Sequence, residues 1–265
     1  MPDQHFYQYA YVWPNWSPGD IGPGVDPRFT VERVGDQPIA AVASRVALDQ
    51  FDVRRLQGNT AEDISWLQRV AIRHDEIICQ VARSSPVLPL RLGTVFQSRA
   101  SLLAAASRVR KTVSDYLHTV GNRQEWTAKL YLEKNAVPEF SGNDGLPRSG
   151  QNPTESAGAD YMRRKKAQLQ KNQERRANLN REIEAVENQL KSNADVARRS
   201  RLLSEDLTGR PERMVFNGAF LLAAPRVRTW LARAARIREF VRRKGLLLEI
   251  AGPWPPYHFC PTPEL

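Results

Sequence analysis

The chain has 265 residues, of which 41% are hydrophobic and 26% charged, and its formal net charge is +10. These values are typical of a soluble protein with one large or two small domains, and the excess of Lys and Arg favours an acidic partner: nucleic acid, an anionic membrane surface or an acidic protein. The two cysteines lack CxxC spacing, and neither a signal-peptide pattern nor an apolar run near the roughly 20 residues of a membrane span is present, so a cytoplasmic protein without disulfides, zinc or membrane insertion is expected.

The first part of the chain predicts three strands. The aromatic and β-branched run at 6–13 favours the first strand. Residues 29–34 and 39–46 favour two more, joined by the turn residues at 35–38.

Two helices are predicted next. The first begins after Thr60, a suitable N-cap, with Asp63 three residues later as in a capping box. Its apolar positions follow helical spacing approximately, at Ile64, Leu67, Ala71, Ile78 and Val81. The second begins after Ser98 or Ser101 and ends at Gly121.

Between these helices, PVLPLRLGTVF favours a strand with a constrained entry. Pro86 and Pro89 have no N–H donor, so each fits a strand start, an edge or a bulge. Gly93 permits a bulge or a close backbone approach. Arg91 in such a strand needs a partner, and a helix carboxylate such as Asp75 or Glu76 is the candidate.

The second part alternates strands and helices. A strand at 125–134 precedes a Gly-, Pro-, Asn- and Ser-rich loop at 137–159. A long polar helix follows, and 198–207 is predicted to return as its helical partner. The remaining elements are a strand at 212–223, a helix at 225–245 and a final strand from 246. This order resembles half of a ferredoxin-like sandwich with a helical insertion.

The long helix carries a narrow apolar stripe, typical of a helical hairpin or coiled coil, at Leu179, Ile183, Val186 and Leu190. The later helix has an apolar face that we expect to cover a sheet rather than a membrane surface, at Trp230, Leu231, Ala234, Ile237, Phe240 and Val241. Residues 160–244 hold 22 Lys and Arg against 10 Asp and Glu, so the positive charge belongs to this region.

No motif specifies an enzyme. His74, Asp75 and Glu76 are adjacent on a helix, so their side chains do not converge on one atom, and His74 is expected to be partly buried and hydrogen-bonded to a neighbour. Phosphate-binding loops, nucleophile elbows and metal-binding histidine pairs are missing from the sequence, so catalytic, cofactor and metal residues are predicted as none. The basic helix predicts an alternative, nucleic-acid association, although no stacking aromatics accompany its Lys and Arg.

Four segments together resemble the GvpF/GvpL family of gas vesicle proteins. They are RHDEII in the first helix, PVLPLRLGTVF, the strand EWTAKLYL and the closing GPWPPYHF. Leu92 stands where the family pattern usually has Phe, and His258 where Ser is common. The resemblance spans nearly the whole chain in the same order.

The element order predicts two α+β domains, residues 1–121 and 122–265, the second ferredoxin-like with a helical pair at about 160–208. The resemblance likewise implies two α+β domains, with a modified ferredoxin-like fold in the first and a helical pair in the second. It also implies a non-enzymatic accessory protein, a minor vesicle component that binds the shell protein GvpA and other Gvp proteins. Shell subunits are apolar and prone to aggregate, so strand edges or an apolar groove with a charged rim would suit this role. The motif positions proposed for protein contacts are Arg91, Gly93, Thr94, Trp254, Pro255, Pro256 and Tyr257. Strand and chain-end packing is the alternative reading of them.

Overall fold

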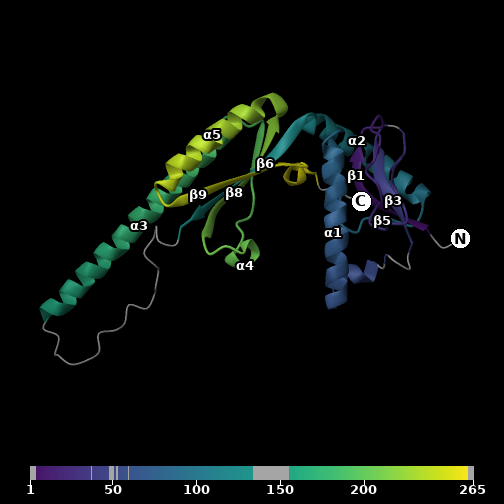
Figure 1. Ribbon diagram of the computed structural model, residues 1–265. Coiled ribbons are helices and arrows are strands. Elements are labelled where there is room, and N and C mark those ends of the chain that lie inside the picture. The colour runs from purple at the N-terminus through teal and green to yellow at the C-terminus, as the bar shows by residue number, and fades with distance from the viewer. Residues whose placement is uncertain are drawn as a thin grey trace. The chain divides into compact units, whose positions relative to one another are not determined.

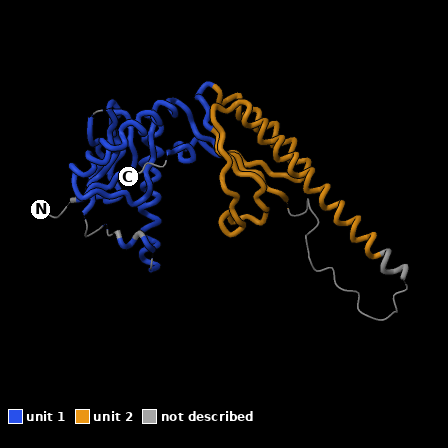
Figure 2. The backbone as a smooth tube through the Cα atoms, turned by 180° about the vertical axis from the view of Figure 1, so that it is seen from behind, with its two compact units in different colours: residues 1–126, 221–225, 251–265 blue, residues 127–220, 226–250 orange. Residues whose placement is uncertain are grey.

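A computed structural model describes residues 4–36, 38–47, 51, 53–58, 60–133 and 155–261. Its internal contacts divide the chain into two compact units (Figures 1 and 2). Unit 1 comprises 1–126, 221–225 and 251–265, and unit 2 comprises 127–220 and 226–250. The predicted α+β class is confirmed. The ferredoxin-like descriptions and the folding domains at 1–121 and 122–265 stay predictions.

The first sheet lies in unit 1 and has five strands in the order β2-β3-β1-β4, with β5 also paired to β1. All its described pairings are antiparallel. The three strands predicted first are present. The five are β1 (Gln4–Val12), β2 (Val31–Val34), β3 (Ala40–Ala47), β4 (Val87–Pro89) and β5 (Val95–Phe96).

Two long helices pack on this sheet, α1 (Ala61–Ala82) and α2 (Arg99–Val120). Both begin where the sequence predicts. The Thr60 hydroxyl accepts a hydrogen bond from Asp63 N at 3.0 Å, and Ser98 forms a capping box with Ser101. Gly121 ends α2 with a φ of 44°, a conformation that glycine adopts without strain. A short 3-10 helix, η1 (Val53–Gln57), precedes α1.

The core of unit 1 joins β1 to α1. Tyr7 and Tyr9 are fully buried and belong to one cluster with Trp66, Val70 and Ile77 of α1. Of the predicted stripe of α1, Ile78 and Val81 are buried as expected, but the buried face also includes Trp66, Val70 and Ile77, which were not predicted. Ile64 of that stripe is 49% exposed.

Residues 87–96 form two short strands rather than the single strand predicted. The β4 strand stops at Pro89, and a turn at 91–94 separates it from β5. Leu88 is buried whereas Leu92 is exposed, so the predicted alternation of one face breaks at this turn. Gly93 has a φ of 82°. The turn that it allows redirects the chain, and the two strands then pair with different parts of β1.

The second sheet has the strand order β7-β8-β6-β9. The division into units passes through β6, β8 and β9. Its region contains β6 (Arg123–Leu132), α3 (Glu155–Lys191), β7 (Val196–Arg199), α4 (Glu205–Thr208), β8 (Arg213–Ala223), α5 (Ala224–Arg242) and β9 (Leu246–Trp254). Most of the predicted loop at 137–159 lies outside the described residues, and its described end, 155–159, belongs to α3.

The helical partner of α3 is α5, not the segment 198–207. The two helices lie side by side in both views (Figures 1 and 2). The indole of Trp230 donates to Leu190 O at 3.0 Å, and Lys244 pairs with Glu182. Four α5 residues of the predicted apolar face are buried: Trp230, Ala234, Ile237 and Val241.

The prediction of a helix at 198–207 is wrong because tertiary hydrogen bonds hold this segment extended. Ser200 N donates to Asn217 O at 2.8 Å. The amide of Asn217 also donates to Arg201 O at 2.8 Å. Arg199 binds the buried carboxylate of Glu187. Only one short helical turn, α4, remains of the predicted helix.

Candidate functional site

The turn between β4 and β5 contains three of the predicted motif positions, and β1 holds it in place. Thr94 Oγ1 donates to Arg91 O at 2.8 Å. Gly93 N donates to the hydroxyl of Tyr7 at 3.1 Å. The side chain of Arg91 is exposed and forms no ion pair with the described residues. The predicted pairing of Arg91 with Asp75 or Glu76 is therefore wrong.

His74 connects this turn to α1. Its Nε2 lies 3.2 Å from Leu90 O, and because a carbonyl only accepts, Nε2 carries the proton. Nδ1, 2.9 Å from the hydroxyl of Tyr7, then accepts from Tyr7. Burial lowers the pKa of His74. Both ring nitrogens are thus engaged in the neutral form, and the histidine is buried and hydrogen-bonded as predicted.

The closing segment, 254–259, is held within unit 1 by hydrogen bonds of three side chains. Tyr116 donates to Pro256 O at 3.1 Å. The buried carboxylate of Glu125 accepts a hydrogen bond from His258 N at 2.9 Å, and its other oxygen lies 2.6 Å from His258 Nδ1. The hydroxyl of Tyr257 hydrogen-bonds to Asp75 of α1. The segment 254–259 is therefore positioned by the two long helices and by the start of β6.

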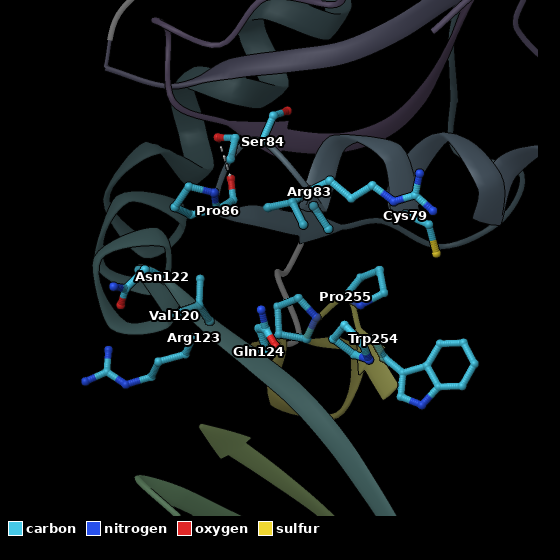
Figure 3. A pocket seen from close by; sticks show the side chains of 16 residues that line it. Cys79, Arg83, Ser84, Pro86, Val120, Asn122, Arg123, Gln124, Trp254 and Pro255 are labelled. Atoms are coloured by element: carbon cyan, nitrogen blue, oxygen red, sulfur yellow. Dashed lines mark hydrogen bonds between the residues drawn. The ribbon is translucent and has the colours of Figure 1, made fainter. Parts of the chain in front are cut away.

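A groove of about 600 Å³ lies beside this segment (Figure 3). Its walls come from the end of α1 with the following turn, from 120–124 and from 253–256. Trp254 is 42% exposed, and Figure 3 shows it on the opposite side of the pocket from Arg123. Arg83, which follows α1 and also lines the groove, is exposed. An exposed indole and prolines with two guanidinium groups suit an apolar peptide segment that also carries acidic residues.

Cys79 is the cysteine that lines the groove, and its surroundings do not activate it. Burial raises the pKa of the Cys79 thiol to about 11, and the nearby Asp75 carboxylate adds to this. A thiol with so high a pKa stays protonated at neutral pH and is a poor nucleophile. Within the described ranges, no three His, Cys, Asp or Glu side chains are grouped as metal ligands. In the same ranges, no helix has both the length and the apolar character of a membrane span.

The seven predicted positions therefore fall in two places. Trp254, Pro255 and Pro256 line the groove. Tyr257, the next residue, hydrogen-bonds to Asp75. Arg91, Gly93 and Thr94 form the separate turn, which does not line the groove. Their role in protein contacts stays a prediction.

Sequence reasoning missed the other walls of the groove and the residues that anchor its closing segment. Asp75 is 182 residues from Tyr257 in the sequence, and Glu125 is 133 residues from His258. The only available signal was the order of the motif segments, which contain these four residues but do not show which ones pair.

The basic residues considered for nucleic acid lie on α3 between residues 163 and 176. They are exposed: Arg163, Arg164, Lys165, Lys166, Arg175 and Arg176. They belong to a helix of unit 2 and do not line the groove.

Comparisons with known proteins match both units. The pattern of the family described as "Gas vesicle synthesis protein GvpL/GvpF" matches residues 5–261. Gas vesicle protein L from Streptomyces sp. (strain CB03234) is 26% identical over 244 residues, which cover 91% of this chain and 85% of the relative.

Two crystal structures share the fold. GvpF from Anabaena sp. PCC7120 superposes with a TM-score of 0.67 at 17% identity, over 98% of each chain. GvpF from Microcystis aeruginosa gives a TM-score of 0.63 at 15% identity, over 96% of this chain and 98% of the other.

Proposed function

The chain belongs to the GvpL/GvpF family of gas vesicle proteins, and from that premise we propose that it is a non-enzymatic accessory protein of gas vesicle assembly that binds the shell protein GvpA and other Gvp proteins. The observation that carries the proposal is the family match over residues 5–261. Because this match includes both units, it does not reflect one shared module in an unrelated protein. The site of action is the growing gas vesicle.

The groove of unit 1 is the surface proposed for shell-protein contact. An apolar, aggregation-prone subunit needs an apolar surface that is itself rimmed by charge. Trp254 supplies exposed apolar area, and Arg83 and Arg123 supply charge on the groove walls. The backbone of this wall is held by Tyr116 and Glu125, so little conformational freedom is lost on binding.

Two observations support the non-enzymatic part of the proposal. The ring nitrogens of His74 are both occupied by Tyr7 and Leu90 inside the core. The thiol of Cys79 has a raised pKa and so stays protonated. Neither group is prepared for acid–base or nucleophilic chemistry.

The test is a pull-down of purified GvpA by the chain, beside vesicle formation in a strain lacking this protein. Trp254→Ala should reduce capture of GvpA by about tenfold, because exposed aromatic anchors dominate interfaces. Leu207→Ala is the matched control, since Leu207 is a 73% exposed apolar side chain that does not line the groove. Normal vesicles in the deletion strain together with no capture of any Gvp protein would overturn the proposal.

Nucleic-acid association is the second candidate, and the exposed Lys and Arg of α3 favour it. Binding of RNA through phosphates should weaken steeply with salt and be indifferent to Trp254→Ala. Capture of GvpA through the groove should instead fall with Trp254→Ala and weaken less steeply with salt.

A further inference from the structure

The apolar stripe of α3 extends beyond its contact with α5. Positions seven residues apart along the helix are Met162, Leu169, Arg176, Ile183 and Leu190. Ile183 and Leu190 are buried, whereas Met162 is 65% and Leu169 56% exposed. A spacing of seven keeps these side chains on one face of a helix. On this face of α3, the apolar side chains of the second half are therefore covered, whereas Met162 and Leu169 of the first half are exposed.

The uncovered half is long enough for a protein partner. Residues 161–178 are exposed except Asn172, which is half-buried. At 1.5 Å per residue they span about 27 Å, or five helical turns. Figure 2 shows α3 continuing past α5 within unit 2. An isolated helix gains little stability from propensity alone, so a helix of this length is expected to pack on something.

The charge of this half determines which partner fits. Residues 161–178 contain seven Lys and Arg and one acidic residue, Glu174, for a net charge of +6. Two of the cations lie on the stripe itself. Arg176 is seven residues after Leu169, and Lys165 is three after Met162. A second copy of this chain would bring like charges together on the stripe, which costs free energy. A partner whose apolar stripe is flanked by carboxylates complements the net positive charge of this half.

We propose that residues 161–178 dock an acidic amphipathic helix of another protein, as a two-stranded coiled coil that continues the α3–α5 interface. Met162 and Leu169 supply the apolar contacts, and the flanking Lys and Arg select the acidic partner. This surface is distinct from the groove in its residues, and the proposal does not depend on binding of GvpA.

The probe is a synthetic peptide of three heptads, about 21 residues, with Leu at its a and d positions and Glu at e and g. Its control is a scrambled peptide of the same composition, which keeps the charge and loses the stripe. Binding to the full chain is measured by isothermal titration calorimetry. The ordered peptide should bind about tenfold more tightly than the scrambled one.

Variants of the chain localise the effect. Leu169→Asp should lower the affinity of the chain for the ordered peptide about tenfold, because the substitution removes an apolar contact and adds a repelling charge. Ala167→Asp makes the same change of charge at an exposed position off the stripe, and it should weaken binding much less. Circular dichroism checks that both variants keep the helical content of the parent chain.

Three results would overturn the proposal. Equal binding of the two peptides would show attraction by charge alone. Equal loss of binding in Leu169→Asp and Ala167→Asp would place the contact elsewhere. A dimer of the free chain, detected by sedimentation and dissociated by Leu169→Asp, would show that a second copy covers the stripe. None of these outcomes bears on GvpA binding by the groove, which is measured separately.

Discussion

The two units differ in the polar contacts that accompany their apolar packing. In unit 1, the hydrogen bond between Tyr7 and His74 joins β1 to α1 beside the apolar core, and buried polar pairs also link Tyr9 of β1 to Ser44 of β3 at 2.8 Å and Glu125 to His258. In unit 2, the contact between α3 and α5 is mainly apolar, centred on Trp230 and the stripe of α3. Buried hydrogen bonds are directional and apolar contacts are not. The directional hydrogen bonds of unit 1 therefore fix which side chains pair, whereas the apolar stripe of α3 can pack against other apolar partners.

Three of the four family-like motifs lie in unit 1, and the fourth, EWTAKLYL, begins there with Glu125 and Trp126 and continues into unit 2. RHDEII supplies His74, which hydrogen-bonds to Leu90 O just before the turn at 91–94, and Asp75, which hydrogen-bonds to Tyr257. The closing motif supplies Tyr257 and His258 to α1 and to Glu125. The motifs are thus linked to one another by side-chain contacts, and Trp254 is left half-exposed beside them.

The largest effect should come from the apolar contact of unit 2. Trp230→Ala removes a fully buried side chain and should lower the free energy of unfolding by about 4 kcal/mol. Phe240→Ala is the control on the same helix, where a 53% exposed aromatic should cost less than about 1 kcal/mol. Urea unfolding followed by tryptophan fluorescence and circular dichroism measures both. Similar losses in the two variants would contradict an α5 face centred on Trp230.

The hydrogen bonds of unit 1 should give the next largest effect. Tyr7→Phe keeps the ring but leaves Gly93 N and His74 Nδ1 without their partner inside the core. We expect a loss of about 2 kcal/mol in the free energy of unfolding. Tyr161→Phe, at a 59% exposed tyrosine, should have no measurable effect. If Tyr7→Phe left the free energy of unfolding unchanged, these hydrogen bonds would not stabilise unit 1.

Elements set by local chemistry could be predicted from the sequence, and those set by distant contacts could not. Thr60, Ser98 and Gly121 act on the nearest turn of their own helices, so their caps were recognised. The segment 198–207 was misassigned because its extended form depends on Asn217 and Glu187.

The candidate site likewise has a part that could be predicted from the sequence and a part that could not. The motif positions from Trp254 to Pro256 were singled out, and they do line a groove. Their partners in its walls, such as Arg83 and Arg123, belong to ordinary helix and strand ends whose sequence carries no sign of a groove. The exposure of Arg91 was missed because the turn at Gly93 interrupts the strand that was predicted there.

Acidification should destabilise the two units in different pH ranges. Burial lowers the pKa of His74 in the folded chain, so the unfolded chain binds a proton first and stability falls as the pH drops below about 6.5. Hydrogen bonding to Arg199 lowers the pKa of Glu187 in unit 2. Its contribution is therefore complete above about 4.5 and is lost as the pH falls further.

Two variants separate these ranges. His74→Gln should flatten the dependence of unfolding free energy on pH between about 7.5 and 5.5, where the slope from one proton is at most about 1.4 kcal/mol per pH unit. Glu187→Gln should leave that range unchanged and flatten the dependence below about 4.5. Both are followed by urea unfolding in buffers of matched ionic strength. A parent slope that His74→Gln does not alter would show that His74 is not the group that titrates.

The smallest effect should come from the contact at the edge of the groove. Tyr257 is 37% exposed, and burial together with its hydrogen bond to Asp75 raises its pKa. Because water can reach both partners, Tyr257→Phe should lower the free energy of unfolding by less than about 1 kcal/mol. Its effect on GvpA capture should still exceed that of Leu207→Ala, since Asp75 and Tyr257 fix the chain immediately after Trp254. Unchanged capture by Tyr257→Phe beside reduced capture by Trp254→Ala would show that the indole acts without this support, and that the groove is held by Tyr116 and Glu125 alone.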